Sequence, residues 1–186
     1  MSKKSIEPGL LLGPVPAALV SCADKDGKGN IITLAWVGVV NSEPPMVSVS
    51  VRPSRYSHGL ILETKEFVVN VPTADMAEKV DGCGVTSGRN INKFETFGLT
   101  PLRGMLDYAP YIGECPICLE CKVKQVLNLG SHDLILGQII NVMADETVLD
   151  HAGRYDPVAL EFLGFSGGHY LGARKTGQKA GFSRKK

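Results

Sequence analysis

The 186-residue sequence lacks any apolar run close to the ~20 residues that a membrane-spanning helix requires. Its longest apolar run, residues 31–40, is interrupted by Thr33 and Gly38. The lysines near the N-terminus are not followed by an apolar stretch of signal-peptide length. We therefore expect a cytoplasmic protein with no membrane partner.

The sequence also lacks a large net charge of either sign, because 20 basic and 19 acidic side chains leave a formal charge of only +1. The sequence thus has no overall electrostatic signature of a nucleic-acid-binding protein. The charge is unevenly distributed, since residues 174–186 contain basic but no acidic side chains. We expect a single domain over residues 1–186, with a core at about 10–172 and a basic tail at 174–186.

Cysteine is scarce, and its odd number, five, fits a reducing compartment better than a disulfide framework. Cys115, Cys118 and Cys121 have the C-x-x-C-x-x-C spacing seen in some iron–sulfur and zinc sites. A full set needs four thiolates, and Cys22 and Cys83 each stand alone in the sequence. In a strand, Cys115 and Cys121 would point to one face and Cys118 to the other. We expect small buried or reactive thiols here and no metal site.

Glycine (21) and proline (11) are frequent enough to favour β structure with many turns over a helix bundle. Residues 24–29 read as a hairpin turn. The strands that we expect lie at residues 15–23, 30–40, 46–51, 66–71, 117–127, 134–143 and 158–162. The helices that we expect lie at residues 57–64 and 73–80, the second capped by Thr73, and a glycine-rich loop at 81–97 contains a short helical piece near residue 93. Many short strands with few helices predict a mainly β fold, a closed or partly closed antiparallel barrel.

The first candidate binding segment is the strand from Asn30 to Trp36. Asn30, Thr33 and the small Ala35 would let a flat ligand approach the backbone, whose N–H and C=O groups would make the polar contacts. Trp36, the only tryptophan, could stack on a ligand or line a pocket. The alternative is an ordinary core strand.

The second candidate runs from a strand end through a proline turn into a helix start, at residues 48–57. Arg52 and Arg55 offer charge-assisted donors, Ser54 and Ser57 offer hydroxyls, and the helix N-terminus offers free N–H groups. This combination suits a phosphate monoester. The alternative is a capped helix flanked by solvated arginines.

The third candidate is the glycine-rich segment at residues 82–94. Its three glycines, two hydroxyls, Arg89 and Lys93 could surround an anion with backbone N–H groups. It matches neither the P-loop nor the Rossmann fingerprint. Among the histidines no pair has the spacing of a helical zinc site, and His132 lies in a turn that leads into a strand.

These segments together resemble the flavin reductase-like family with the FMN-binding split barrel, and in particular its flavoredoxin branch. The resemblance covers roughly residues 10–172, and the order and spacing of its motifs are more specific than any single motif. The matching stretches are PVPAALVS (14–21), NIITLAW (30–36), PPMVSVSV (44–51), EFVVN (66–70), SGRNINKF (87–94), LECKV (119–123), GSH (130–132) and LGQI (136–139).

The resemblance implies a Greek-key split barrel, a homodimer, and FMN bound near the subunit interface. It implies contacts to the flavin ring and ribityl chain from the first segment, and phosphate contacts from the second and third. The cofactor-binding residues that it implies are Asn30, Ile32, Thr33, Leu34, Ala35, Trp36, Ser50, Val51, Arg52, Arg55, Ser57, Thr86, Ser87 and Lys93.

The resemblance also implies an FMN-dependent oxidoreductase that passes electrons from NAD(P)H or a protein donor to flavin, ferric iron or a redox partner. The alternative is a non-enzymatic FMN electron carrier that shuttles electrons between partner proteins. Many reductases of this family carry Gly-Asp-His where the pyridine nucleotide docks, and here the triplet is Gly130-Ser131-His132. His132 is therefore a candidate contact on the nicotinamide side.

Overall fold

The structure, a computed structural model, describes residues 1–156, 160–173, 176–178 and 180–184. Residues 158 and 159 of the expected strand at 158–162 and five of the six basic residues of the tail lie outside this part of the chain. Of the described residues 160–162, only Phe162 is in a strand, so the strand begins later than expected, at Phe162. Among the described residues no helix is both long enough and apolar enough to cross a membrane.

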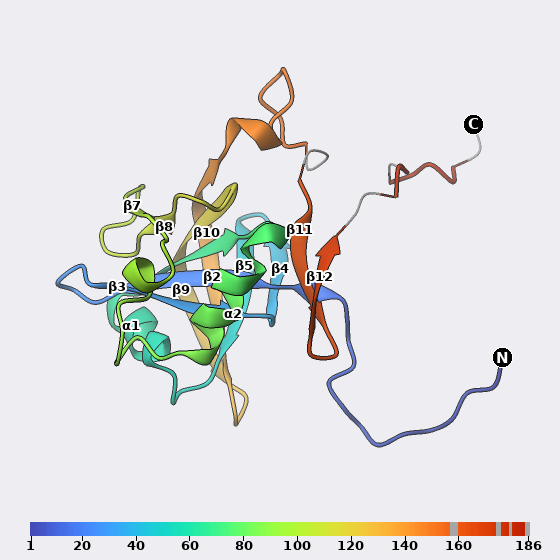
Figure 1. The fold of residues 1–186 in the computed structure, drawn as a ribbon, viewed down its shortest axis with the longest axis horizontal. Coiled ribbons are helices and arrows are strands. Elements are labelled where there is room, and N and C mark those ends of the chain that lie inside the picture. Colours follow the sequence, from blue (N-terminus) through green and yellow to red (C-terminus); the bar gives the residue numbers. More distant parts are fainter. Residues whose placement is uncertain (157–159, 174–175, 179, 185–186) are drawn as a thin grey trace.

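The main sheet is antiparallel throughout and has seven strands, in the order β3-β2-β6-β9-β10-β5-β4 (Figure 1). Its strands are β2 (Ala18–Ala23), β3 (Gly29–Leu34), β4 (Val37–Ser42), β5 (Pro45–Val51), β6 (Glu66–Val71), β9 (Ile117–Asn128) and β10 (Asp133–Ala144). β9 and β10 lie between β5 and β6, so the connection from β5 to β6 crosses them in a Greek-key order.

The sheet closes into a barrel because its two edge strands, β3 and β4, are neighbours in the chain. Only Ala35 and Trp36 separate them, so the edges must come together. Next to this junction the Ser50 N–H donates to the Trp36 carbonyl over 3.0 Å. The single strand expected at residues 30–40 is therefore wrong: the chain leaves one edge at Leu34 and joins the other at Val37. We call residues 34–37 the seam of the barrel.

The interior of the barrel is a buried apolar cluster formed by the side chains of alternate residues of the strands. Val47, Val49 and Val51 point inward, whereas Ser48 and Ser50 between them stay half-buried on the other face. This confirms the alternation expected for β5, because successive side chains of a strand point to opposite faces. Helix α1 (Tyr56–Thr64), close to the expected 57–64, adds Leu60 and Ile61 to the same cluster.

A second buried cluster covers the outer face of β2, β3 and β6. It is built by the short 3₁₀ helix Ala74–Met76, α2 (Ala77–Val85), α3 (Lys93–Thr96) and the small sheets (Figure 1). One small sheet has three strands: β1 (Val15–Pro16), β11 (Phe162–Ser166) and β12 (His169–Ala173). The other pairs β7 (Pro101–Leu102) with β8 (Tyr111–Ile112). A 3₁₀ turn at Glu146–Val148 follows β10.

Two expectations about the helices are corrected here. The side chain of Thr73 makes no capping hydrogen bond, because the backbone at this point pairs with β11: Thr73 bridges Phe162, and the Ala74 N–H donates to the Glu161 carbonyl. The expected loop from residue 81 is helical up to Val85, so two of its three glycines lie in α2.

Two buried carboxylates anchor the loop at residues 104–110 to the sheet. Glu120 of β9 accepts hydrogen bonds from the N–H groups of Met105 and Leu106. Glu66 of β6 accepts them from residues 107, 108 and 109. Both side chains are almost completely buried, so these N–H groups depend on them for partners.

Candidate functional site

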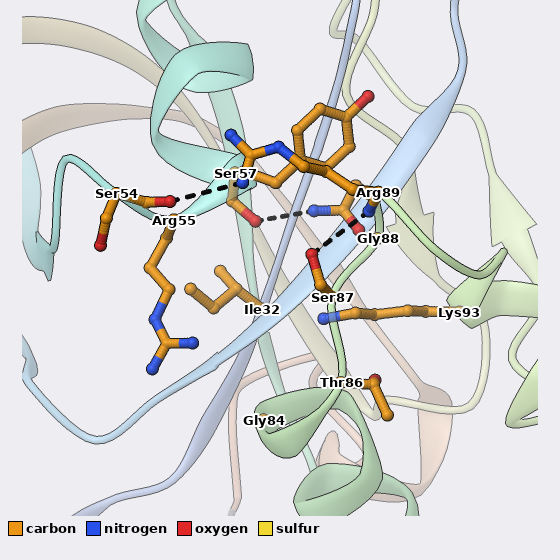
Figure 2. Close-up of a pocket in the computed structure, with 12 residues that line it drawn as sticks. Ile32, Ser54, Arg55, Ser57, Gly84, Thr86, Ser87, Gly88, Arg89 and Lys93 are labelled. Atoms are coloured by element: carbon orange, nitrogen blue, oxygen red, sulfur yellow. Dashed lines mark hydrogen bonds between the residues drawn. The ribbon is translucent and has the colours of Figure 1, made fainter.

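A cavity of about 160 Å³ opens at the start of β3, where the three candidate segments meet (Figure 2). β3 forms one wall, the turn from β5 into α1 a second, and the loop from α2 to α3 a third. Its lining residues are Asn30, Ile32, Ser54, Arg55, Tyr56, Ser57, Gly84, Thr86, Ser87, Gly88, Arg89 and Lys93. The fold thus brings together residues up to 63 positions apart in the sequence, and we call this cavity the anion pocket.

The N-terminus of α1 gives the anion pocket a positive partial charge. Arg55 precedes the first helical residue, its side chain makes no capping hydrogen bond, and the first turn contains no acidic residue. The exposed N–H groups and the dipole at this end are therefore available to an anion from outside the helix. Ser57, in the first turn, adds a hydroxyl to the same wall.

Arg89 closes the pocket from the opposite side. Its guanidinium carbon lies 5.3 Å from the centre of the Tyr56 ring, and Nη1 lies 3.5 Å from the Ser54 carbonyl (Figure 2). The Ser87 hydroxyl accepts from the Arg89 N–H over 3.3 Å. These contacts link the α2–α3 loop to the start of α1 and leave most of the guanidinium donors free.

Asn30 and Gly88 determine how closely the two loops approach. Asn30 is buried, and its Nδ2 donates to the Ser57 hydroxyl over 2.8 Å. A Cβ on Gly88 would lie 1.9 Å from Asn30 Oδ1, so only glycine fits without displacing the asparagine.

Lys93 lines the anion pocket, but its ammonium group is already engaged with the backbone. Nζ donates to the carbonyls of Ile31 over 2.7 Å and Cys83 over 2.6 Å, so it joins β3 to α2. Burial lowers the pKa of Lys93. An ammonium has three donors, so one remains for a ligand.

A second group of the expected residues gathers at the seam, outside the anion pocket. The Trp36 and His132 rings lie 4.5 Å apart between centres. Ser131 Oγ lies 2.9 Å from His132 Nδ1. Partial burial and the nearby charge of Arg52 lower the pKa of His132, so its imidazole is neutral at pH 7.

The expected binding residues therefore fall into three sets. Asn30, Ile32, Arg55, Ser57, Thr86, Ser87 and Lys93 line the anion pocket, whereas Leu34, Ala35, Trp36, Ser50 and Arg52 lie at or beside the seam. Two others are directed elsewhere: the Thr33 hydroxyl donates to the Val80 carbonyl, and Val51 points into the barrel core. For Val51 a ligand could reach only the backbone, because the side chain is completely buried.

Tyr56 lines the anion pocket without having been expected there, whereas Gly84 is one of the three glycines of the third candidate segment. Tyr56 lies between Arg55 and Ser57 of the second segment. This position was the sequence signal that could have indicated a place in the pocket. Gly84 is part of α2, and a Cβ there would lie 3.3 Å from Thr33. Helix packing against β3 explains this glycine, and the sequence pattern alone did not separate that role from anion binding.

A buried hydrogen bond connects the two groups of residues. His58 of α1 lies one position after Ser57, and its Nε2 is 2.7 Å from Asp133 Oδ2, one position after His132. Asn128 Nδ2 donates to the other carboxylate oxygen over 2.8 Å. The carboxylate of Asp133 is therefore bound to His58 of α1. The side chain that contacts the His132 ring is that of Ser131.

Replacing Asp133 by asparagine is expected to remove a pH-dependent part of the stability. Hydrogen bonds from His58 and Asn128 hold the pKa of Asp133 below its ordinary value. A depressed carboxyl pKa stabilises the fold at pH values above the unfolded-state pKa of about 3.9, and this contribution is lost as the pH falls through the folded-state value. Urea unfolding should show the largest difference between wild type and Asp133→Asn near neutral pH, and this difference should shrink as the pH falls below about 3.9. A difference that stays constant with pH would contradict this assignment.

Comparison with known proteins identifies the family. A family model described as flavin reductase like domain matches residues 12–159, which include the anion pocket and the seam. The chain belongs to the flavin reductase-like family.

Solved structures of this family superimpose on almost the whole chain. Flavoredoxin of Desulfovibrio vulgaris (Miyazaki F) is 32% identical with a TM-score of 0.90, over 98% of this chain and 99% of that one. Flavoredoxin from Methanosarcina acetivorans is 31% identical with a TM-score of 0.91, over 98% and 97%. FMN-binding protein from Thermus thermophilus with bound 1-cyclohex-2-enone is 26% identical with a TM-score of 0.79, over 93% and 97%. These likenesses confirm the mainly β split barrel expected from the sequence.

Proposed function

We propose that this flavin reductase-like protein is an FMN-dependent oxidoreductase. In this proposal, electrons pass from NAD(P)H or a protein donor through FMN to free flavin, ferric iron or a redox partner. Family membership and the FMN-binding and flavoredoxin relatives support it. The observation that carries it is the anion pocket, which joins two arginines, several hydroxyls and a helix N-terminus at the start of β3.

The residues of the anion pocket fit the phosphate end of FMN. The cavity, about 160 Å³, is smaller than the ~300 Å³ or more of a usual ligand pocket, so it would enclose one end of a larger molecule. Guanidinium groups of Arg55 and Arg89 are strong donors to a phosphate, and the hydroxyls of Ser54, Ser57 and Ser87 add neutral donors. Among the described residues that line the cavity, none has an acidic side chain that would oppose an anion.

The seam fits the flat end of the same ligand. From Asn30 to Trp36 the chain advances six residues, about 20 Å at 3.3 Å per residue, so an extended molecule could follow β3 from pocket to seam. Flavin, when bound, supplies both hydride and single-electron chemistry. The protein binds the phosphate, orients the ring through backbone donors of β3, and shields it with Trp36. His132, neutral and held by Ser131, presents a polar edge to a nicotinamide without adding positive charge.

A homodimer is part of the proposal. Trp36, Val39 and Val40 leave 43%, 79% and 49% of their surface exposed on and beside β4. Neighbouring large apolar side chains on one strand are typical of a surface that another chain covers. Size-exclusion chromatography with light scattering should give twice the monomer mass, and a monomer at micromolar concentration would argue against it.

The alternative is an FMN carrier that exchanges electrons only with partner proteins. The observation in its favour is the Gly130-Ser131-His132 triplet, in which serine replaces the aspartate of many reductases in the family. Asp133, the nearest acidic residue in the chain, is bound to His58 and cannot substitute for it.

Two measurements test the proposal and separate it from the alternative. Titration of the purified protein with FMN, followed by absorbance and flavin fluorescence, should show saturable binding, and absence of binding would refute both versions. Anaerobic reduction and steady-state oxidation of NADH and NADPH with free FMN as acceptor then discriminate. Turnover supports the reductase, whereas bound, reducible FMN without NAD(P)H turnover supports the carrier.

Arg55→Ala is expected to weaken FMN binding about 10-fold or more, since hydrogen bonds to charged groups contribute about 1.5–3 kcal/mol. Arg154→Ala is the matched control, because Arg154 pairs with Asp150 on the surface and does not line the anion pocket. The measurement is the FMN dissociation constant at two salt concentrations. Equal affinities for the two variants would show that Arg55 does not hold the phosphate.

A further inference from the structure

Three sulfur-bearing side chains border a separate cavity of about 180 Å³ at the start of β9. Cys115, Cys118 and Met143 line it together with Leu102, Tyr111, Gly113, Ala144 and Asp145. None of these residues lines the anion pocket or lies at the seam. The cavity is therefore independent of the proposed flavin site.

The turn before β9 places Cys115 and Cys118 beside the same cavity. The Cys115 N–H donates to the Ile112 carbonyl over 3.1 Å, which forms the turn. The Cys118 thiol then lies 3.5 Å from both the Ile112 and the Cys115 carbonyls, over that turn. Both cysteines belong to the same buried cluster. A C-x-x-C turn of this kind is how many proteins present two thiolates to one metal ion.

Strand pairing supplies the third sulfur. Met143 of β10 is directly opposite Cys118 of β9 in the antiparallel register. Directly opposite residues have Cβ atoms about 4.5–5.5 Å apart and side chains on the same face. The Asn141 amide lies 3.4 Å from Met143 Sδ, so the thioether is oriented by a neighbour as well as by its strand.

The third cysteine of the sequence motif is excluded from this cavity. Cys121 belongs to the barrel interior, whereas Cys115 and Cys118 belong to the outer cluster. The expectation that Cys115 and Cys121 share a face is therefore wrong, because Cys115 precedes β9 and its direction is determined by the turn. The structure replaces the third thiol of the motif with a thioether.

This donor set selects a soft cation. Among the described residues no group of three or more histidine, cysteine, aspartate or glutamate side chains could hold a metal ion. Zinc normally takes four ligands of those types, so its coordination would be incomplete here. Thiolate and thioether sulfur are the ligands that select copper(I), and copper sites with two or three sulfur donors need no fourth protein ligand.

We propose that Cys115, Cys118 and Met143 form a binding site for one copper(I) ion. On binding, the ion replaces the two thiol protons, which pass to solvent, and the thioether completes a three-sulfur site. The low exposure of both cysteines, 6% and 1%, keeps water and competing ligands away from the ion.

The test is an anaerobic competition of the full-length protein with a chromophoric copper(I) chelator. Wild type should withdraw one equivalent of copper(I). Cys115→Ser and Cys118→Ser should each lower the affinity at least about 100-fold, because even partners outside a coordination sphere change metal affinity about 10- to 100-fold. Met143→Leu keeps the volume of the side chain, so it should fold normally and lower the affinity about 10-fold.

Cys121→Ser is the matched control, since its thiol is equally buried but faces the barrel interior. Circular dichroism and FMN binding report the fold of each variant independently of copper. The proposal is overturned if wild type takes up no copper(I), if Cys121→Ser loses it as strongly as Cys118→Ser, or if Met143→Leu binds it as wild type does. It is also overturned if thiol counting shows that Cys115 and Cys118 are a disulfide in freshly purified protein, or if zinc(II) binds tightly and independently of Met143.

Discussion

Gly88→Ala is expected to raise the dissociation constant of FMN about 30- to 140-fold, equivalent to about 2–3 kcal/mol. The new Cβ would lie 1.9 Å from Asn30 Oδ1 and 3.2 Å from the Tyr56 ring. Asn30 is buried and cannot move without breaking its hydrogen bond to Ser57. The substitution would therefore separate the two loops that form the anion pocket and displace a hydroxyl from its wall.

Gly59→Ala is the matched control for this prediction. Gly59 is an exposed residue of α1, three residues into the same helix, and a Cβ there would meet no atom within 4 Å. Alanine should stabilise the helix by about 0.5–1 kcal/mol and leave FMN affinity unchanged. Isothermal titration calorimetry of both variants measures the difference. If Gly88→Ala binds FMN as tightly as Gly59→Ala, the close approach of the loops is not required for binding.

Glu120→Ala is expected to lower the free energy of unfolding by about 3–5 kcal/mol, because several buried donors lose their acceptor at once. Glu120 is completely buried and accepts from the N–H groups of Met105 and Leu106 and from the Asn141 amide. Gly104 packs against the same carboxylate, since a Cβ there would lie 2.3 Å from it. Without the carboxylate these donors lose the acceptor that ties them to the sheet, so the loop at 104–110 should detach from β9.

Glu63→Ala supplies the comparison, because Glu63 is an exposed residue of α1 and should change the stability by no more than about 0.5 kcal/mol. Urea unfolding monitored by tryptophan fluorescence and circular dichroism measures both variants. In a chain of this size, a loss of about 4 kcal/mol corresponds to a fall in Tm of roughly 8–16 °C. A Glu120→Ala variant as stable as Glu63→Ala would mean that the loop N–H groups find other partners.

Glu120 is close in the sequence to Cys115 and Cys118, which border the cavity of the proposed copper(I) site. Neighbouring residues of this short segment therefore have different roles in the fold. In residues 115–121, a turn cysteine and the first strand cysteine face a cavity, a glutamate anchors a loop, and the last cysteine fills the barrel. The strand alternation explains why Cys118 and Cys121 point to opposite faces, because they are an odd number of positions, three, apart.

Short-range preferences in the amino-acid sequence account for much of the local structure and for which residues make up the proposed site. Alternation in β5, the turn at residues 24–29 and the helix after Arg55 all follow from short-range preferences, and they appear in the structure within a few residues of the expected bounds. The segments that line the anion pocket could also be picked out in the sequence, because the proposed recognition of a phosphate requires arginines, hydroxyls and a helix start whatever the surrounding fold.

Other features depend on residues far apart in the chain and follow only from the tertiary structure. Closure of the barrel breaks the strand expected at 30–40 at the seam, since the edges β3 and β4 must meet there. Backbone carbonyls of β3 and α2 accept two of the hydrogen bonds that the Lys93 ammonium can donate. The register of β9 with β10 places Met143 beside Cys118. Local sequence patterns determine which face of a strand a side chain lies on. The residues that this side chain contacts are determined by how strands far apart in the chain pair with one another.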